Sequence, residues 1–221
     1  MSVHLNHKQE RVISLTEHFL KNELYYDNTG HDWWHISRVT NIAKKIAIIE
    51  NADVFICIIA SLLHDIADEK ISGDEEIGLY RVEHWLKKNE VLNGDIAHIL
   101  EIISTMSYKG GTNKCTMSTL EGKIVQDADR LDAIGAIGIS RVMCYSAVKQ
   151  RPIHHPELTP RTVITLDDYR NSGTAIMHFY EKLLKLKDLM NTDYAKQLAA
   201  GRHEVLEKYL EQFLYEWDGI K

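Results

Sequence analysis

Apolar residues recur every three or four positions along most of this chain, which is the spacing of one face of an α-helix. The run from Val54 to Ile66 is apolar on all sides, and its length favours a central buried helix over a strand. Only residues 162–166 look β-like, and they are few. The pattern therefore predicts an all-α, compact multi-helix fold. The expected helices cover residues 8–24, 32–50, 54–66, 75–89, 93–107, 117–136, 138–148, 168–190 and 193–217, the last capped by Thr192 or Asp193.

One connection stands apart from this helical pattern. All three prolines, Pro152, Pro156 and Pro160, fall between residues 150 and 165, so this segment cannot be helical throughout. A loop of this length is either a lid over a functional site or a plain crossover between helices, and the pattern favours neither. No repeat or linker divides the chain, so a single domain over residues 1–221 is expected.

Composition narrows the class of protein. The 221 residues are 44% hydrophobic and 26% charged, which is ordinary for a soluble globular protein. A net charge of −6 argues against a nucleic-acid duplex as partner. No apolar run is long enough to span a bilayer, and the N-terminal stretch lacks the apolar core of a signal peptide. We therefore expect a cytoplasmic protein with no membrane partner, and a homodimer stays open.

The three cysteines support the same compartment. Cys57, Cys115 and Cys144 are far apart and form no C-x-x-C pair. They are expected to be reduced residues that fill the core of a cytosolic protein.

Histidine and aspartate interrupt the apolar helices near their ends. Asp32 is placed to cap a helix whose first turn carries His35, which taken alone fits core packing better than metal binding. The buried run then ends on His64-Asp65, and Asp68 would lie one helical turn beyond His64 on the same face. Uncompensated polar groups at a core boundary cost free energy, so either a metal ion or ordinary hydrogen bonds must satisfy them.

The segment VQDADRLDAIGAIG adds further carboxylates to an apolar helix. Asp127 and Asp129 would point about 200° apart, whereas Asp129 and Asp132 can share a face. A metal site would use Asp129, Asp132 or both. The alternative is a salt-bridged polar stripe that involves Arg130.

The order along the chain is H…HD…D. Two imidazoles and two carboxylates form a mixed nitrogen and oxygen ligand set, which suits Mn²⁺, Fe²⁺, Co²⁺ or Zn²⁺ with water completing the shell. No thiolate takes part, so a structural zinc finger is excluded.

Four sequence blocks resemble the HD-domain metal-dependent phosphohydrolase superfamily, in particular a bacterial branch that includes nucleotide pyrophosphohydrolases. They are GHDWWHISRVTNIA, LLHDIADEK, VQDADRLDAIGAIGISRV and HFYEKLLKLKDLM, within residues 10–215. The resemblance implies an HD-domain fold with the metal site between central helices. It implies metal binding by His35, His64, Asp65 and Asp129, with Mn²⁺ preferred and Mg²⁺, Co²⁺, Fe²⁺ or Zn²⁺ as alternatives. It also implies that Asp68 and Glu69 handle the attacking water, whereas the role of Asp132 stays open.

A phosphate substrate needs positive partners besides the metal. His178, Lys182 and Lys185 would share one face of the helix 168–190, either toward substrate or as a solvated stripe. Trp33 and Trp34 either stack a base or pack in the core, and core packing is favoured. The full set of substrate-binding candidates is Arg38, Lys70, Lys109, His178, Lys182 and Lys185.

The resemblance implies an activity: hydrolysis of (deoxy)nucleoside triphosphates to monophosphate and pyrophosphate. The partner would then be a small phosphate ester, a nucleotide. A nucleoside monophosphate phosphatase or a phosphodiesterase is the first alternative. A noncatalytic sensor of metal and nucleotide is the second, and the presence of all four ligands together with Asp68 argues against it.

Overall fold

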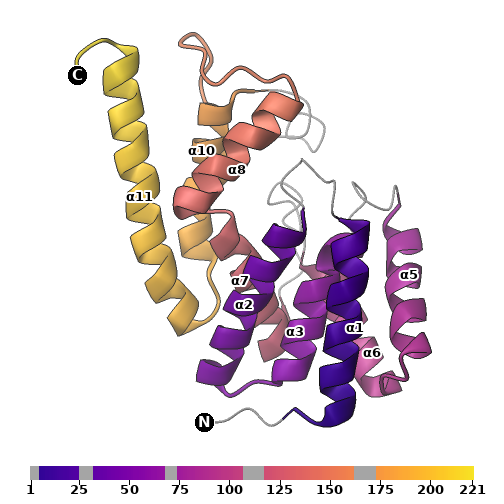
Figure 1. Ribbon diagram of the computed structural model, residues 1–221. Helices are drawn as coiled ribbons and strands as arrows, with labels where there is room; N and C mark the ends of the chain where they lie inside the picture. The colour runs from indigo at the N-terminus through magenta and orange to yellow at the C-terminus, as the bar shows by residue number, and fades with distance from the viewer. Residues whose placement is uncertain (1–4, 25–31, 68–73, 107–116, 162–172) are drawn as a thin grey trace. The chain divides into compact units, whose positions relative to one another are not determined.

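The computed structural model describes residues 5–24, 32–67, 74–106, 117–161 and 173–221, and the regular elements in these ranges are all helical (Figure 1). The predicted all-α fold is confirmed. The α-helices are α1 (His7–Glu23), α2 (Trp33–Glu50), α3 (Val54–Leu63), α5 (Glu75–Lys88), α6 (Asn93–Thr105), α7 (Leu120–Asp132), α8 (Gly135–Val148), α10 (Ala175–Glu181) and α11 (Asp193–Trp217). Two 3₁₀ helices, η1 (His64–Ala67) and η3 (Leu183–Leu189), join them.

The helices form two compact units. The first unit holds α1, α2, α3, η1, α5, α6 and α7 as far as Asp129. The second unit holds the chain from Arg130 onward, with α8, α10, η3 and α11. The expectation of one domain over residues 1–221 stays a prediction.

Helix α3 forms the centre of the first unit. All of its residues are buried, and α1, α2 and α6 pack against it. The chain reverses between α2 and α3 because Asn51 adopts a left-handed conformation (φ 57°) and Asp53 caps α3 through the Ile56 amide. The two helices therefore run in opposite directions (Figure 1), and the start of α2 lies at the same end as the end of α3.

Helix α5 buries only part of the stripe that sequence spacing predicts for residues 75–89, namely Ile77, Tyr80, Trp85 and Leu86. Its buried side chains include Val82 and Leu86, whereas Ile77 and Tyr80 are 56% and 67% exposed. Trp85, also on the predicted stripe, stacks on Phe19 of α1 with ring centroids 4.3 Å apart. Sequence spacing identified the helix and the buried Leu86 correctly, but it missed Val82 and placed the exposed Ile77 and Tyr80 on the apolar face.

The prediction of one continuous helix over residues 168–190 is wrong in its second half. Helix α10 ends at Glu181, and Lys182 leaves helical geometry with φ −134° and ψ −60°. The chain then continues as η3, in which the buried Leu183 and Leu186 are three residues apart and so point the same way. Of the two predicted caps of α11, Thr192 is the one that forms: its side chain accepts a hydrogen bond from the Ala195 amide. Residues 168–172, and the β-like 162–166, lie outside the described residues.

The described part of the proline-rich connection is bonded to α10. The amides of Ala175 and Ile176 donate to the carbonyls of Pro152 and Ile153 at 3.1 and 3.0 Å. The Arg161 guanidinium donates to both carboxylate oxygens of the buried Glu181 at 2.8 and 2.9 Å. These bonds favour a fixed crossover over a lid as far as Arg161, and residues 162–165 lie outside the described residues.

The cysteines differ in burial from the prediction. Cys57 is buried in α3, as expected, whereas Cys144 of α8 is exposed and does not fill a core. Cys115 lies outside the described residues.

No single helix in the part of the chain that the structure describes is long and apolar enough to cross a membrane. The bent pair α7 and α8, taken together, has the length and composition of a broken span, and nothing beyond length and composition supports that reading.

The turn into α8 depends on two glycines of the second unit. Gly135 has a φ of 74°, and a Cβ there would lie 3.1 Å from Cβ of Arg202. A Cβ on Gly138 would lie 2.2 Å from the carbonyl oxygen of Ala133, which is closer than real contacts allow. The repeated glycine in AIGAIG is therefore a steric requirement of this turn.

The variant Gly138→Ala should lower the free energy of unfolding by about 1–3 kcal/mol, because the Ala133 backbone must move to admit the methyl group. The matched variant is Gly201→Ala in α11, where a Cβ meets no atom within 4 Å. It should raise the free energy of unfolding by about 0.5–1 kcal/mol, since alanine loses less conformational entropy in a helix. Urea unfolding of both variants measures the difference, and effects of the same sign would contradict the steric assignment.

Candidate metal centre

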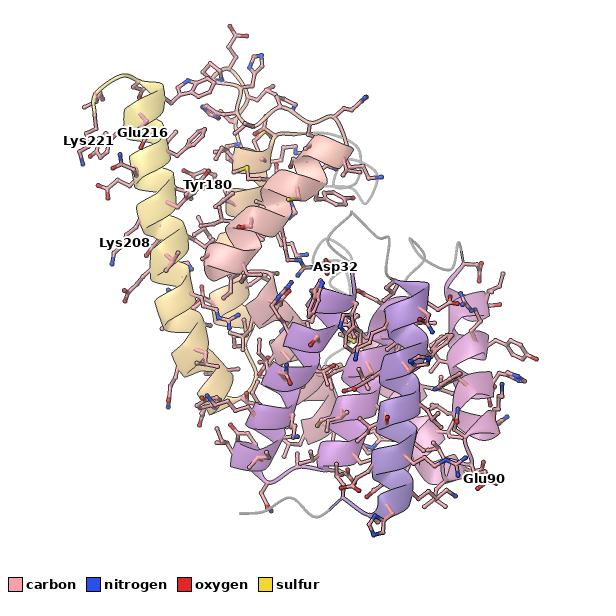
Figure 2. All side chains as sticks on the ribbon, in the orientation of Figure 1. Asp32, Glu90, Tyr180, Lys208, Glu216 and Lys221 are labelled. Carbon is pink, nitrogen blue, oxygen red and sulfur yellow. The ribbon has the colours of Figure 1, made fainter. Side chains whose placement is uncertain are left out.

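His35 is placed by the cap of α2. The Asp32 carboxylate accepts a hydrogen bond of 2.8 Å from the His35 amide, as predicted, and starts the helix at this point (Figure 2). His35 then lies in the first turn, where only 1% of it is exposed. A buried imidazole at this position is directed into the first unit and away from solvent.

His64 and Asp65 lie where α3 tightens into the 3₁₀ helix η1. Nδ1 of His64 is 2.8 Å from the carbonyl oxygen of Ser61. A carbonyl can only accept, so Nδ1 carries the proton and Nε2 of the neutral ring presents its lone pair. This contact to a backbone carbonyl fixes the tautomer of the ring, which is how metal-binding histidines are commonly oriented.

The side chains predicted to bind metal converge on one point of the first unit. Nε2 of His35 lies 3.5 Å from Oδ2 of Asp65 and 3.5 Å from Oδ1 of Asp129. Nε2 of His64 lies 3.2 Å from Oδ1 of Asp65 and 3.9 Å from Oδ1 of Asp129. The two imidazole rings meet edge to face, with centroids 5.4 Å apart.

These separations fit a shared divalent ion. An ion about 2.0–2.2 Å from each ligand atom sets neighbouring ligand atoms about 3–3.6 Å apart by simple geometry. His35, His64 and Asp129 each offer a ligand atom within 4.8 Å of the others, and Asp65 contacts both imidazoles. Two neutral imidazoles and two carboxylates also carry a charge of −2, which a divalent cation neutralises.

Exposure differs among the four residues. His35, His64 and Asp65 are buried, whereas the Asp129 side chain is 39% exposed. A bound ion would therefore be enclosed on the histidine side and reachable on the Asp129 side. Catalytic metal sites keep such an open position for water or substrate.

Asp132 is placed differently from Asp129. It is buried in the second unit, and its Oδ2 accepts a hydrogen bond of 2.9 Å from Nη1 of Arg141. The group of candidate ligand atoms found among the described residues contains Asp129 and not Asp132. Arg130 donates to the carbonyl of Leu189. The alternative of a salt-bridged stripe thus holds for Asp132, but its partner is Arg141.

The predicted substrate-binding residues are distributed over both units. Arg38 lies one turn after His35 on α2, half-buried, in the first unit. His178, Lys182 and Lys185 belong to the second unit, and they do not share a face of one α-helix because α10 ends at Glu181. Four further predicted site residues lie outside the described residues: Asp68, Glu69, Lys70 and Lys109.

The sequence predicts an α-helix through His64, in which Asp68, four residues on, would share the face of His64. The chain from His64 to Ala67 is instead a 3₁₀ helix, in which residues three apart are aligned. The assignment of Asp68 to the attacking water therefore rests on the family resemblance alone.

The sequence favours core packing for the two tryptophans beside His35, and the structure shows both at least partly exposed. Trp34 is 66% exposed. Trp33 is partly exposed, and Nζ of Lys21 lies 4.7 Å from the centre of its ring. The prediction of core packing was wrong for Trp34, and base stacking stays a prediction for either ring.

Comparison with known proteins identifies the family. The model of the HD domain matches residues 33–134, a range that holds all four converging residues. A solved HD-superfamily hydrolase from Bacillus thuringiensis is 44% identical, with a TM-score of 0.74 over 96% of this chain and 98% of that chain. The chain belongs to the HD superfamily of hydrolases. The predicted resemblance is confirmed, and the protein is a metal-dependent hydrolase of the HD type.

Two further relatives resemble this HD hydrolase over nearly its whole length. A solved protein from Lactobacillus plantarum is 38% identical, with a TM-score of 0.85 over 95% of this chain and 98% of that chain. The uncharacterised protein YpgQ of Bacillus subtilis is 37% identical over 196 residues, which is 88% of each chain. The structure of YpgQ in complex with ADP has a TM-score of 0.76 over 95% of this chain and 96% of that chain.

Proposed function

We propose that this HD hydrolase cleaves (deoxy)nucleoside triphosphates to a nucleoside monophosphate and pyrophosphate. The observation that carries the proposal is the convergence of His35, His64, Asp65 and Asp129 on one point that is open to solvent at Asp129. A nucleotide substrate is supported by the ADP bound to YpgQ, a relative of similar length and fold.

His35, His64, Asp65 and Asp129 would together hold one divalent ion. When bound, such an ion neutralises charge on phosphoryl oxygens and lowers the pKa of a water molecule toward neutrality. Mn²⁺ is our first choice because the family resemblance implies it, and the mixed nitrogen and oxygen donor set also suits Fe²⁺, Co²⁺ or Zn²⁺. The protein contributes a neutral His64 ring held by Ser61, a buried Asp65 against both imidazoles, and Asp129 at the exposed edge.

Other residues of the chain would activate the attacking water and bind the phosphate oxygens. Water would add to phosphorus as the bond between the α- and β-phosphates breaks, so that pyrophosphate leaves and a monophosphate remains. Asp68, with Glu69 as its neighbour, would orient this water and take its proton. The cationic candidates would bind the phosphate oxygens, with Arg38 nearest in sequence to a metal residue.

Product analysis tests the proposal. The purified full chain, supplied with Mn²⁺, is incubated in separate reactions with nucleoside triphosphates, monophosphates and cyclic nucleotides of both sugars. Pyrophosphate, orthophosphate and nucleoside monophosphate are measured separately. We expect pyrophosphate and monophosphate in equal amounts. Orthophosphate from monophosphates would indicate a phosphatase instead, and turnover of cyclic nucleotides alone would indicate a phosphodiesterase. If the protein binds these nucleotides but hydrolyses none of them, it is a noncatalytic sensor of metal and nucleotide.

A further inference from the structure

Helices α3 and α7, which lead to His64 and Asp129, are linked at their starts by the side chain of Glu121. Glu121 lies in the first turn of α7, and its Oε1 accepts a hydrogen bond of 3.0 Å from the backbone amide of Asp53. Asp53 is the residue that caps α3. The Glu121 side chain is only 16% exposed, whereas Asp53 lies at the surface.

Both helices run from this contact toward the metal centre. His64 follows Asp53 by a distance of about 16 Å along α3, and Asp129 follows Glu121 by about 12 Å along α7. Each helix behaves as a rod over this length, so a shift along its axis at one end reappears at the other. The separation of His64 Nε2 from Asp129 Oδ1, 3.9 Å, therefore depends on the axial offset between the two helices.

We propose that Glu121 is a positioning residue that sets this offset and so holds Asp129 within reach of a metal bound by His64. The proposal rests on the proposed metal centre. Metal–ligand distances tolerate only about 0.2 Å, so a small axial freedom of α7 would weaken binding. The length of the Glu121 side chain is critical, because its carboxylate must extend from the first turn of α7 to the Asp53 amide.

Neighbouring contacts tie the start of α7 to α6. Nε2 of His98 on α6 lies 3.0 Å from Oγ1 of Thr119, and the Ser118 hydroxyl donates to Glu101 at 2.6 Å. Oε2 of Glu121 also lies 3.8 Å from Nε2 of His98. Glu121 thus adds the contact to α3 on top of those to α6.

The carboxylates of Glu121 and Asp53 change the pKa values of neighbouring ionisable groups. Burial, followed by the nearby carboxylates of Glu121 and Asp53, raises the pKa of the Cys57 thiol. Burial and Asp53 likewise raise the pKa of Asp95, and His98 partly offsets this. The contact itself requires an acceptor oxygen that reaches the Asp53 amide, and a side-chain amide oxygen of the same length also provides one.

Two variants separate reach from charge. Glu121→Asp keeps the charge and the favourable first-turn position but shortens the side chain by one methylene group. Glu121→Gln keeps the length and an acceptor oxygen but removes the charge. The matched control is Glu23→Asp, which shortens the carboxylate that accepts from Arg81 at 2.9 Å between α1 and α5 in the same unit.

Mn²⁺ affinity of the full chain, measured by calorimetry without nucleotide, is the readout, and thermal unfolding confirms that each variant is folded. Glu121→Asp should weaken the affinity about tenfold, at the lower end of the loss caused by removing an outer-shell partner. Glu121→Gln and Glu23→Asp should bind as wild type. Equal affinity for Glu121→Asp and wild type would overturn the proposal, as would a loss confined to Glu121→Gln. A wild-type chain that binds no divalent ion would instead overturn the metal centre, and this proposal with it.

Discussion

Replacing His64 with alanine is expected to abolish tight Mn²⁺ binding and, with it, hydrolysis. His64 is the imidazole whose tautomer is fixed by the Ser61 carbonyl, and its Nε2 faces both Asp65 and Asp129. Removing an outer-shell partner alone costs about 10–100-fold in metal affinity, so the loss of a ligand should exceed 100-fold. Elemental analysis and calorimetry on the same preparation measure the effect.

The control for this prediction is His84→Ala, which removes an exposed imidazole from α5 of the same unit. It should leave metal content unchanged. Asp65→Ala should behave like His64→Ala, because Asp65 lies 3.5 Å from His35 and 3.2 Å from His64. If both variants retain metal near the wild-type level, the ligand assignment is wrong, whatever happens to activity.

Metal binding should also stabilise the first unit, which gives an independent control for folding. A ligand that binds only the native state raises the free energy of unfolding by mass action. The midpoint of thermal unfolding should therefore rise with added Mn²⁺ for wild type and His84→Ala. For a folded His64→Ala variant, the midpoint of thermal unfolding should not change with added Mn²⁺.

The second large effect is expected at Asp68. The variant Asp68→Asn should lower kcat by roughly 10²–10⁴-fold, the usual contribution of general base catalysis, while metal content and nucleotide affinity stay near wild type. An amide preserves the shape of the side chain but cannot take a proton from water. Steady-state kinetics and metal analysis on one preparation test both parts.

Glu69→Gln is the matched variant for Asp68, because it makes the same chemical change at the adjacent position. If Asp68 is the base, Glu69→Gln should retain most of the turnover. The reverse result would transfer the role to Glu69, and loss of metal in Asp68→Asn would make Asp68 a ligand. Little change in either variant would mean that both are solvated charges.

The sequence by itself determined the helical class, the caps and the donor set of the metal centre. Apolar spacing determines a helix locally, and the predicted caps Asp32 and Thr192 accept bonds from amides three residues on. The H…HD…D order is visible because ligand chemistry belongs to side chains. Even the antiparallel course of α2 and α3 is implied by the short connection between them.

Tertiary structure decided what depends on distant partners. Asp129 and Asp132 are equivalent by helical spacing, yet one faces the histidines and the other pairs with Arg141. The exposure of Trp34 and the end of α10 at Glu181 likewise depend on what packs around them.

Two contacts at the metal helices lay beyond sequence reasoning for a different reason. The Ser61 carbonyl that fixes the His64 ring and the Asp53 amide that donates to Glu121 are backbone groups. Every residue except proline carries both, so no residue type marks the carbonyl or amide that will be used. Only the folded chain, which brings the first turn of α7 to the cap of α3, selects them.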